Sequence, residues 1–89
     1  MNARQSNRKG ALTRNSEYFA DPHAADAYTI GSAVFHAGHP MGDIESRAPR
    51  LPGWRQAWVR AVASLGPSIA LRYARDGYSD FEEIRNFAD

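Results

Sequence analysis

Cysteine is absent from this 89-residue sequence, so neither disulfide bonds nor thiolate-bound metals can hold its fold together. A chain of this length forms one domain with a small core. Its apolar runs fall well short of the roughly 18 residues that a membrane-spanning helix needs, and no charged and then apolar leader opens it. We therefore expect a small cytoplasmic domain that makes no contact with a membrane.

The motifs of common enzymes are also missing. There is no Gly-rich phosphate loop followed by Lys-Ser or Lys-Thr, and no pair of carboxylates in an apolar setting. His36, His39 and Asp43 are the candidate metal ligands, but no fourth ligand accompanies them and the two histidines lie on either side of a predicted helix end. We expect no enzymatic activity, no metal site and no cofactor.

Charge is segregated along the chain although the net charge is only +1. Residues 1–20 carry a charge of +3, and residues 21–46 carry −4. Residues 47–75 contain six arginines and no acid, and residues 76–89 return to −4. A surface selected only for solubility mixes both signs. The stretch 47–75, called the basic segment below, is therefore the strongest electrostatic signal of the sequence.

Helix signals recur along the chain, whereas no strict alternation is long enough to predict a strand. Residues 1–20 are polar and lack apolar periodicity, which predicts a disordered basic tail. Asp21-Pro22 is a typical helix start and Gly38 a typical helix end, so we expect a first helix over about residues 22–37. Gly31 costs this helix about 1 kcal/mol relative to alanine. The close approach of another helix at Gly31 would offset that cost.

A second helix is expected to open at Pro52, after a proline-containing linker at residues 38–51. Its apolar residues recur at helical spacing and form one stripe: Trp54, Ala57, Trp58, Ala61, Val62 and Leu65. Core packing of the two tryptophans would fix this helix on the first one near Gly31, and stacking on RNA bases is the alternative. Trp58 lies deeper in the stripe, and we expect Trp54 to be half exposed.

The acidic C-terminal extension, residues 67–89, contains two further helix signals. The first predicts a helix over residues 67–76 that Gly77 ends, with four residues turned inward: Ile69, Ala70, Tyr73 and Ala74. Ser79 and Glu82 form a capping box that predicts a short last helix, whose apolar residues are Phe81, Ile84 and Phe87. The predicted fold is therefore all-α: a tail at 1–20, a hairpin-like two-helix unit at 21–66, and one or two short helices at 67–89.

The two-helix unit resembles ribosome modulation factor and its small relatives over about residues 24–62. The resemblance rests on the pattern Ala27-x3-Gly31-x5-Ala37-Gly38, on Pro40, and on the string Leu51-x-Gly53-Trp54-Arg55-x-Ala57. Proteins of that family have two helices joined by a proline-containing linker. The resemblance implies binding to the small ribosomal subunit near the end of its rRNA, which blocks mRNA engagement and promotes inactive ribosome dimers during slow growth.

The arginines of the basic segment are either solvated surface charges or an anion-binding face, which would contact RNA phosphates without reading sequence. The basic tail could add affinity by releasing counterions, or it could only solvate the chain end. The predicted residues for binding RNA or another partner are Arg47, Arg50, Trp54, Arg55 and Arg60, with Arg8, Lys9 and Arg14 of the tail.

A second hypothesis assigns the function to the acidic extension. In it, the protein is a phage-encoded inhibitor that binds a host protein or ribonucleoprotein, such as a CRISPR effector, by mimicking phosphate. The residues would be Asp76, Asp80, Glu82 and Glu83. Alternatively, the acidic residues 76–89 pack against the basic segment and neutralise it. We favour this packing, because Phe81, Ile84 and Phe87 need apolar surface to bury against.

Overall fold

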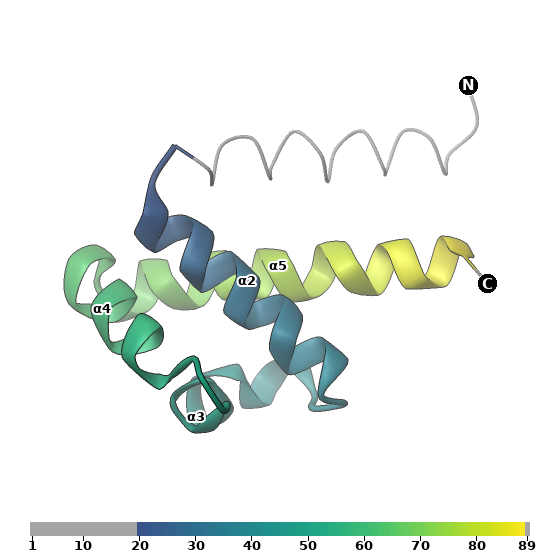
Figure 1. Cartoon of the computed structure of the whole chain (residues 1–89). Coiled ribbons are helices and arrows are strands. Elements are labelled where there is room, and N and C mark those ends of the chain that lie inside the picture. Colours follow the sequence, from purple (N-terminus) through teal and green to yellow (C-terminus); the bar gives the residue numbers. More distant parts are fainter. Residues whose placement is uncertain (1–19, 89) are drawn as a thin grey trace.

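The computed structural model of the protein describes residues 20–88 (Figure 1). In chain order they form α2 (Pro22–His36), η1 (Met41–Asp43), α3 (Ile44–Arg47), η2 (Ala48–Arg50), α4 (Arg55–Leu65) and α5 (Pro67–Ala88), where η denotes a 3-10 helix. This part of the chain contains no strand, so the predicted all-α class is confirmed. The predicted disordered tail, with Arg8, Lys9 and Arg14, lies almost entirely outside the described residues.

The predicted ends of the first helix are confirmed. The Asp21 carboxylate accepts the His23 backbone N–H at 2.9 Å and caps α2. At the other end Gly38 has a φ of 85°, a left-handed conformation that glycine adopts without strain. Its N–H donates to the Phe35 carbonyl at 3.0 Å, and the His39 N–H donates to the Val34 carbonyl at 3.2 Å. This pair of bonds is the Schellman motif, which ends α2 abruptly.

The linker is more ordered than predicted. Residues 41–50 form η1, α3 and η2 in direct succession. Ile44 and Ala48, four residues apart and therefore on one face, are both fully buried. Their burial explains why a stretch rich in turn-forming residues coils tightly on the core.

The predicted start of the second helix at Pro52 is wrong, because residues 51–54 form a β-turn. The Trp54 N–H donates to the Leu51 carbonyl at 3.1 Å, and Gly53 has a φ of 82°. Proline in the second position and a positive-φ glycine in the third are the signature of a type II turn. Helix α4 therefore begins at Arg55, and the Trp54 carbonyl accepts the N–H of Trp58 at 2.9 Å.

The two predicted C-terminal helices are one continuous helix, α5, so the expected break at Gly77 and the capping role of Ser79 and Glu82 are wrong. Gly77 is buried, and a Cβ placed on it would overlap the Tyr28 carbonyl group of α2. The glycine is thus explained by a close helix crossing, not by a helix end. A mid-helix glycine costs about 1 kcal/mol, which burial along a 22-residue helix offsets.

Helix α2 lies across α5 and makes its most extensive contacts with it, while α4 packs beside both (Figure 1). Gly31 does meet another helix, as predicted, but the partner is Ala74 of α5 and not α4. Ile69, predicted to face inward, is 39% exposed. The core gathers buried side chains from α2, α3, η2, α4 and α5: Ala27, Ile30, Val34, Ile44, Ala48, Trp58, Ala61, Ala70, Ala74 and Tyr78.

Candidate nucleic-acid interface

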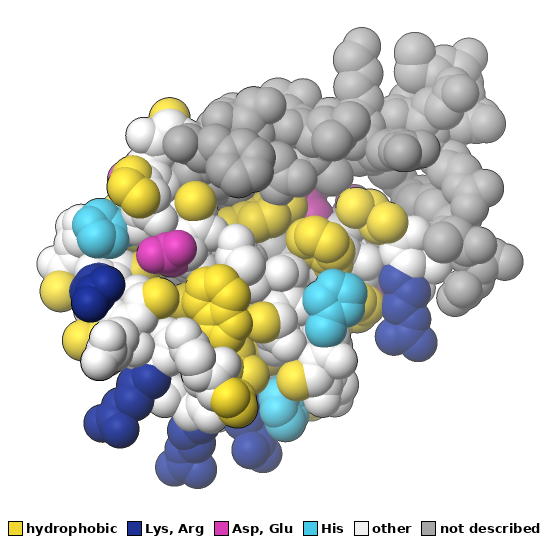
Figure 2. All heavy atoms as spheres, in the orientation of Figure 1, with side chains coloured by type: hydrophobic (Ala, Val, Ile, Leu, Met, Phe, Trp, Pro, Cys, Tyr) yellow, Lys and Arg dark blue, Asp and Glu magenta, His cyan; other side chains and the backbone are white. Residues whose placement is uncertain are grey.

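Three exposed arginines flank the β-turn at residues 51–54. Arg47 ends α3, Arg50 ends η2 and Arg55 is the first residue of α4. We call these three residues the turn arginines. Figure 2 shows Lys and Arg side chains projecting from the lower edge of the molecule, over α3 and the start of α4 in Figure 1. Three short consecutive elements thus bring positive charge to one edge.

The backbone under the turn arginines is fixed by buried apolar side chains. Ile44 and Ala48 are 0% exposed, and Trp58, one turn into α4, is 6% exposed. Because each arginine lies within three residues of one of these anchors along the chain, the arginines project from a packed base. A charged surface on a packed base loses less conformational entropy on binding than the same charges on a flexible segment.

Trp54 lies between Arg50 and Arg55 and is half-buried, as predicted. It packs at the margin of the core while Trp58 is buried within it. The structure therefore separates the two tryptophans by environment: Trp58 is a core residue, and part of the Trp54 side chain remains accessible beside the turn arginines.

Arg60 is exposed but does not join the turn arginines on one face of α4. Five residues separate it from Arg55, which places the two side chains about 140° apart around the helix axis. Arg72 and Arg75, the remaining arginines of the basic segment, are exposed on α5. The predicted four-arginine face is thus divided into a cluster at the turn and a separate Arg60.

The turn arginines have their guanidinium groups available. Within residues 20–88 they form no hydrogen bond or ion pair. The nearest acid in sequence is the exposed Glu45, and the next acid after it is Asp76. Five N–H donors on each guanidinium can therefore contact an anion such as a phosphate.

The acidic residues of the second hypothesis do not form one exposed face. Asp80 is 0% exposed, and the Tyr28 hydroxyl donates a hydrogen bond of 2.7 Å to its carboxylate. Asp76 and Glu83 are partly buried and Glu82 is exposed. Asp80 is thus a core residue of the α2–α5 interface, placed there by a tyrosine that is 52 residues away in the sequence.

The acidic extension packs within the molecule, and its apolar residues contact both α2 and the part of the basic segment that forms α4. Phe81 lies against Tyr28 with ring centroids 6.4 Å apart and against His36 at 5.4 Å. Ile84 is 42% exposed, and the side chain of Phe87 lies outside the described residues. Neutralisation of the basic segment by the acids of residues 76–89 stays a prediction.

The His36 side chain packs on neighbouring rings, and the backbone of His39 accepts a hydrogen bond from α5. His36 contacts the rings of Phe35 and Phe81, and the His39 carbonyl accepts the Tyr78 hydroxyl at 2.8 Å. In the described part of the chain, no three His, Asp or Glu side chains gather as metal ligands would. Among the helices of residues 20–88, none has the length and apolar composition of a membrane span.

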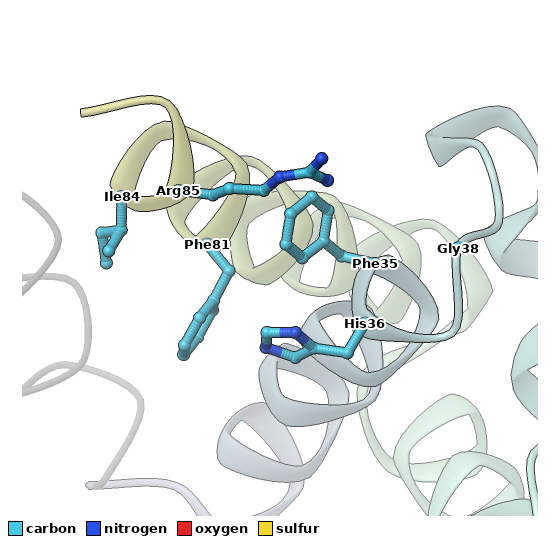
Figure 3. Close-up of a pocket in the computed structure, with 6 residues that line it drawn as sticks. All are labelled: Phe35, His36, Gly38, Phe81, Ile84 and Arg85. Carbon is cyan, nitrogen blue, oxygen red and sulfur yellow. The ribbon is translucent and has the colours of Figure 1, made fainter. Parts of the chain in front are cut away.

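One pocket gathers residues that the sequence analysis did not select as a site. It lies between the ends of α2 and α5 (Figure 3) and is lined by Phe35, His36, Gly38, Phe81, Ile84 and Arg85. Helical spacing does place Phe81, Ile84 and Arg85 on one face of a helix. The pairing of that face with Phe35 and His36 depends on the α2–α5 crossing, for which the sequence carries no direct signal.

In comparisons with protein-family models, curated proteins and solved structures, nothing matches this chain.

Proposed function

We propose that the protein is a small non-enzymatic regulator that binds the ribosome, at the rRNA of its small subunit, through the turn arginines. The observation that carries the proposal is the set of three unpaired, exposed guanidinium groups on a packed base. Phosphate contacts of this kind position a protein on structured RNA without reading its sequence. The resemblance of residues 51–57 to ribosome modulation factor supports the choice of partner.

Trp54 has a stacking role in this proposal. A half-exposed indole next to arginines can stack on an unpaired base, and such stacking contributes about 1–3 kcal/mol per base. Arg60 adds to the long-range attraction of RNA without sharing the contact surface of the turn arginines. The tail residues Arg8, Lys9 and Arg14 add to the same electrostatic term.

Co-sedimentation with ribosomes tests the proposal directly. The tagged full-length protein is mixed with ribosomes and separated on sucrose gradients at low and at physiological salt. We expect it in the small-subunit or whole-ribosome fractions at low salt, with less bound as salt rises because phosphate contacts release counterions. Protein that stays at the top of the gradient at low salt contradicts the ribosomal proposal, and a pull-down from host lysate would then identify the partner.

A further inference from the structure

The pocket between α2 and α5 is built from flat apolar walls that remain open to solvent. Its volume is about 380 Å³, near the lower end of the range of about 300–1,000 Å³ that ligand pockets occupy. Figure 3 shows Phe35 and His36 projecting from α2 toward α5, with the Phe81 ring of α5 next to His36 and Ile84 beyond Phe81. The size fits one or two fused rings of a ligand better than a folded partner.

The rings of the pocket are arranged edge to face. The His36 ring centroid lies 5.2 Å from that of Phe35 and 5.4 Å from that of Phe81, so the imidazole contacts both phenyl rings. Phe35 and Phe81 are half-buried, and Ile84 is 42% exposed. Apolar surface that is still in contact with water in a concave site is stabilised when a planar apolar group covers it.

Arg85 gives the pocket a charge. Its guanidinium carbon lies 5.7 Å from the centroid of the Phe35 ring, within the range of a cation–π interaction (Figure 3). Within residues 20–88 this guanidinium makes no hydrogen bond or ion pair. A guanidinium that is held over a ring keeps its N–H donors at the edge of its plane, where they match the two oxygens of a carboxylate.

Two nearby negative groups do not cancel this positive charge. Glu82 precedes Arg85 by one helical turn and is exposed, but no ion pair joins them. The C-terminal end of α2 also has partial negative charge. Its Val34 and Phe35 carbonyls, however, already accept the N–H groups of His39 and Gly38. The cation at the rim of the pocket therefore remains available to an anion.

We propose that this pocket binds a small planar aromatic carboxylate. Its ring would pack against the surface formed by Phe35, His36 and Phe81, and its carboxylate would accept N–H donors from Arg85. Charge complementarity selects the acid over a neutral or cationic ring of the same shape, because a hydrogen bond to a charged group is roughly twice as strong as a neutral one. The site is independent of the turn arginines and of the ribosomal proposal.

A titration with 2-naphthoate, followed by NMR on the full-length protein, tests this ligand class. We expect saturable shifts of the Phe35, His36, Phe81 and Arg85 resonances. The neutral analogue 2-naphthylmethanol has the same ring system and should bind at least about tenfold more weakly, because it lacks the charged hydrogen bonds. Equal affinity of the two compounds, or the absence of shifts at these residues, overturns the proposal.

Two variants separate the charged contact from the apolar one. Arg85→Gln should weaken 2-naphthoate at least about tenfold and leave 2-naphthylmethanol unchanged. Ile84→Ala should weaken both compounds by a similar factor, because it trims the apolar wall. Arg72→Gln is the matched control, since Arg72 is an exposed arginine of α5 outside the pocket. If Arg72→Gln weakens 2-naphthoate as much as Arg85→Gln, the binding reflects net charge and the proposed site is wrong.

Discussion

Gly31 of α2 lies directly against Ala74 of α5, with no space for a side chain between the two backbones. A Cβ on Gly31 would overlap the Ala74 carbonyl and lie 2.8 Å from its Cα. The crossing is reciprocal, because a Cβ on Gly77 would lie 2.8 Å from the carbonyl carbon of Tyr28 and 3.2 Å from its Cα. Tyr28 and Gly31 are three residues apart, as are Ala74 and Gly77, so one turn of each helix forms the contact.

Alanine at either crossing glycine should destabilise the protein although alanine favours helices. The gain in helix propensity is about 1 kcal/mol, but the added methyl meets rigid backbone, and overpacking of this kind costs about 1–3 kcal/mol or more. Because the methyl would overlap a backbone carbonyl that cannot move aside, the cost lies at the upper end of this range. We expect Gly31→Ala and Gly77→Ala each to lower the free energy of unfolding by about 1–2 kcal/mol in net terms, measured by urea denaturation.

Gly42 is the matched control for these substitutions. An added Cβ there meets nothing within 4 Å, and its φ is not in the left-handed region. Gly42→Ala should therefore be neutral or slightly stabilising. If Gly31→Ala and Gly77→Ala behave like Gly42→Ala, the close α2–α5 crossing is wrong.

The hydrogen bond between Tyr28 and Asp80 gives a second prediction. The Tyr28 hydroxyl donates to a buried carboxylate at 2.7 Å, whereas the Tyr78 hydroxyl donates to the neutral His39 carbonyl at 2.8 Å. Loss of the Tyr28 hydroxyl removes a donor from a fully buried polar group, which costs about 1–3 kcal/mol, whereas a typical neutral hydrogen bond contributes about 0.5–1.5 kcal/mol. Tyr28→Phe should thus lower the free energy of unfolding more than Tyr78→Phe, by thermal or urea denaturation. The opposite order would contradict the burial of the Asp80 side chain at the α2–α5 contact.

Local signals in the sequence were sufficient for the features that depend on neighbouring residues. The caps of α2 were predicted because Asp21, Pro22 and Gly38 act on backbone groups within a few positions of themselves. The burial of Trp58 follows from its place on an apolar stripe. These interactions join residues that are at most one or two helical turns apart in the sequence. A sequence pattern can predict contacts over that range.

The errors arose where distant contacts override local preference. Gly77 resembles a helix stop, but its contact with Tyr28 turns it into a packing residue inside α5. Asp80 was expected on the surface because it is an acid, but its side chain is buried and accepts a hydrogen bond from the Tyr28 hydroxyl. The turn arginines were named correctly as exposed residues. The separation of Arg60 from Arg55 follows from helical spacing alone, whether the helix begins at Pro52 or at Arg55.

The two tryptophans should separate stability from binding. Trp58 is 6% exposed, so Trp58→Ala should cost about 3–5 kcal/mol, a large part of the stability of a small domain. Trp54→Ala should cost less, because Trp54 is only half-buried, and the folded variant should bind ribosomes more weakly if its indole stacks on a base. Circular dichroism melts and gradient sedimentation measure the two effects. Normal ribosome binding by folded Trp54→Ala would remove Trp54 from the site.

The turn arginines provide the decisive variant for the proposed function. The double substitution Arg50→Gln with Arg55→Gln should leave the melting temperature nearly unchanged, because exposed charges contribute little to stability. It should weaken ribosome binding most at low salt. Each lost phosphate contact lowers the slope of log K against log salt by about 0.7–0.9, so two lost contacts lower it by about 1.4–1.8. Quantitative gradient or filter binding at several salt concentrations measures this slope.

A second double variant, Arg60→Gln with Arg72→Gln, removes the same charge from exposed positions outside the turn arginines. If binding depends on net charge alone, both double variants weaken it equally. If the turn arginines contact phosphates, the Arg50 and Arg55 pair causes the larger loss and the larger change in slope, because direct contacts release counterions at the site whereas distant charges act only through a screened field. Equal losses of ribosome binding would mean that binding depends on total charge alone, and the turn arginines would then not be the site.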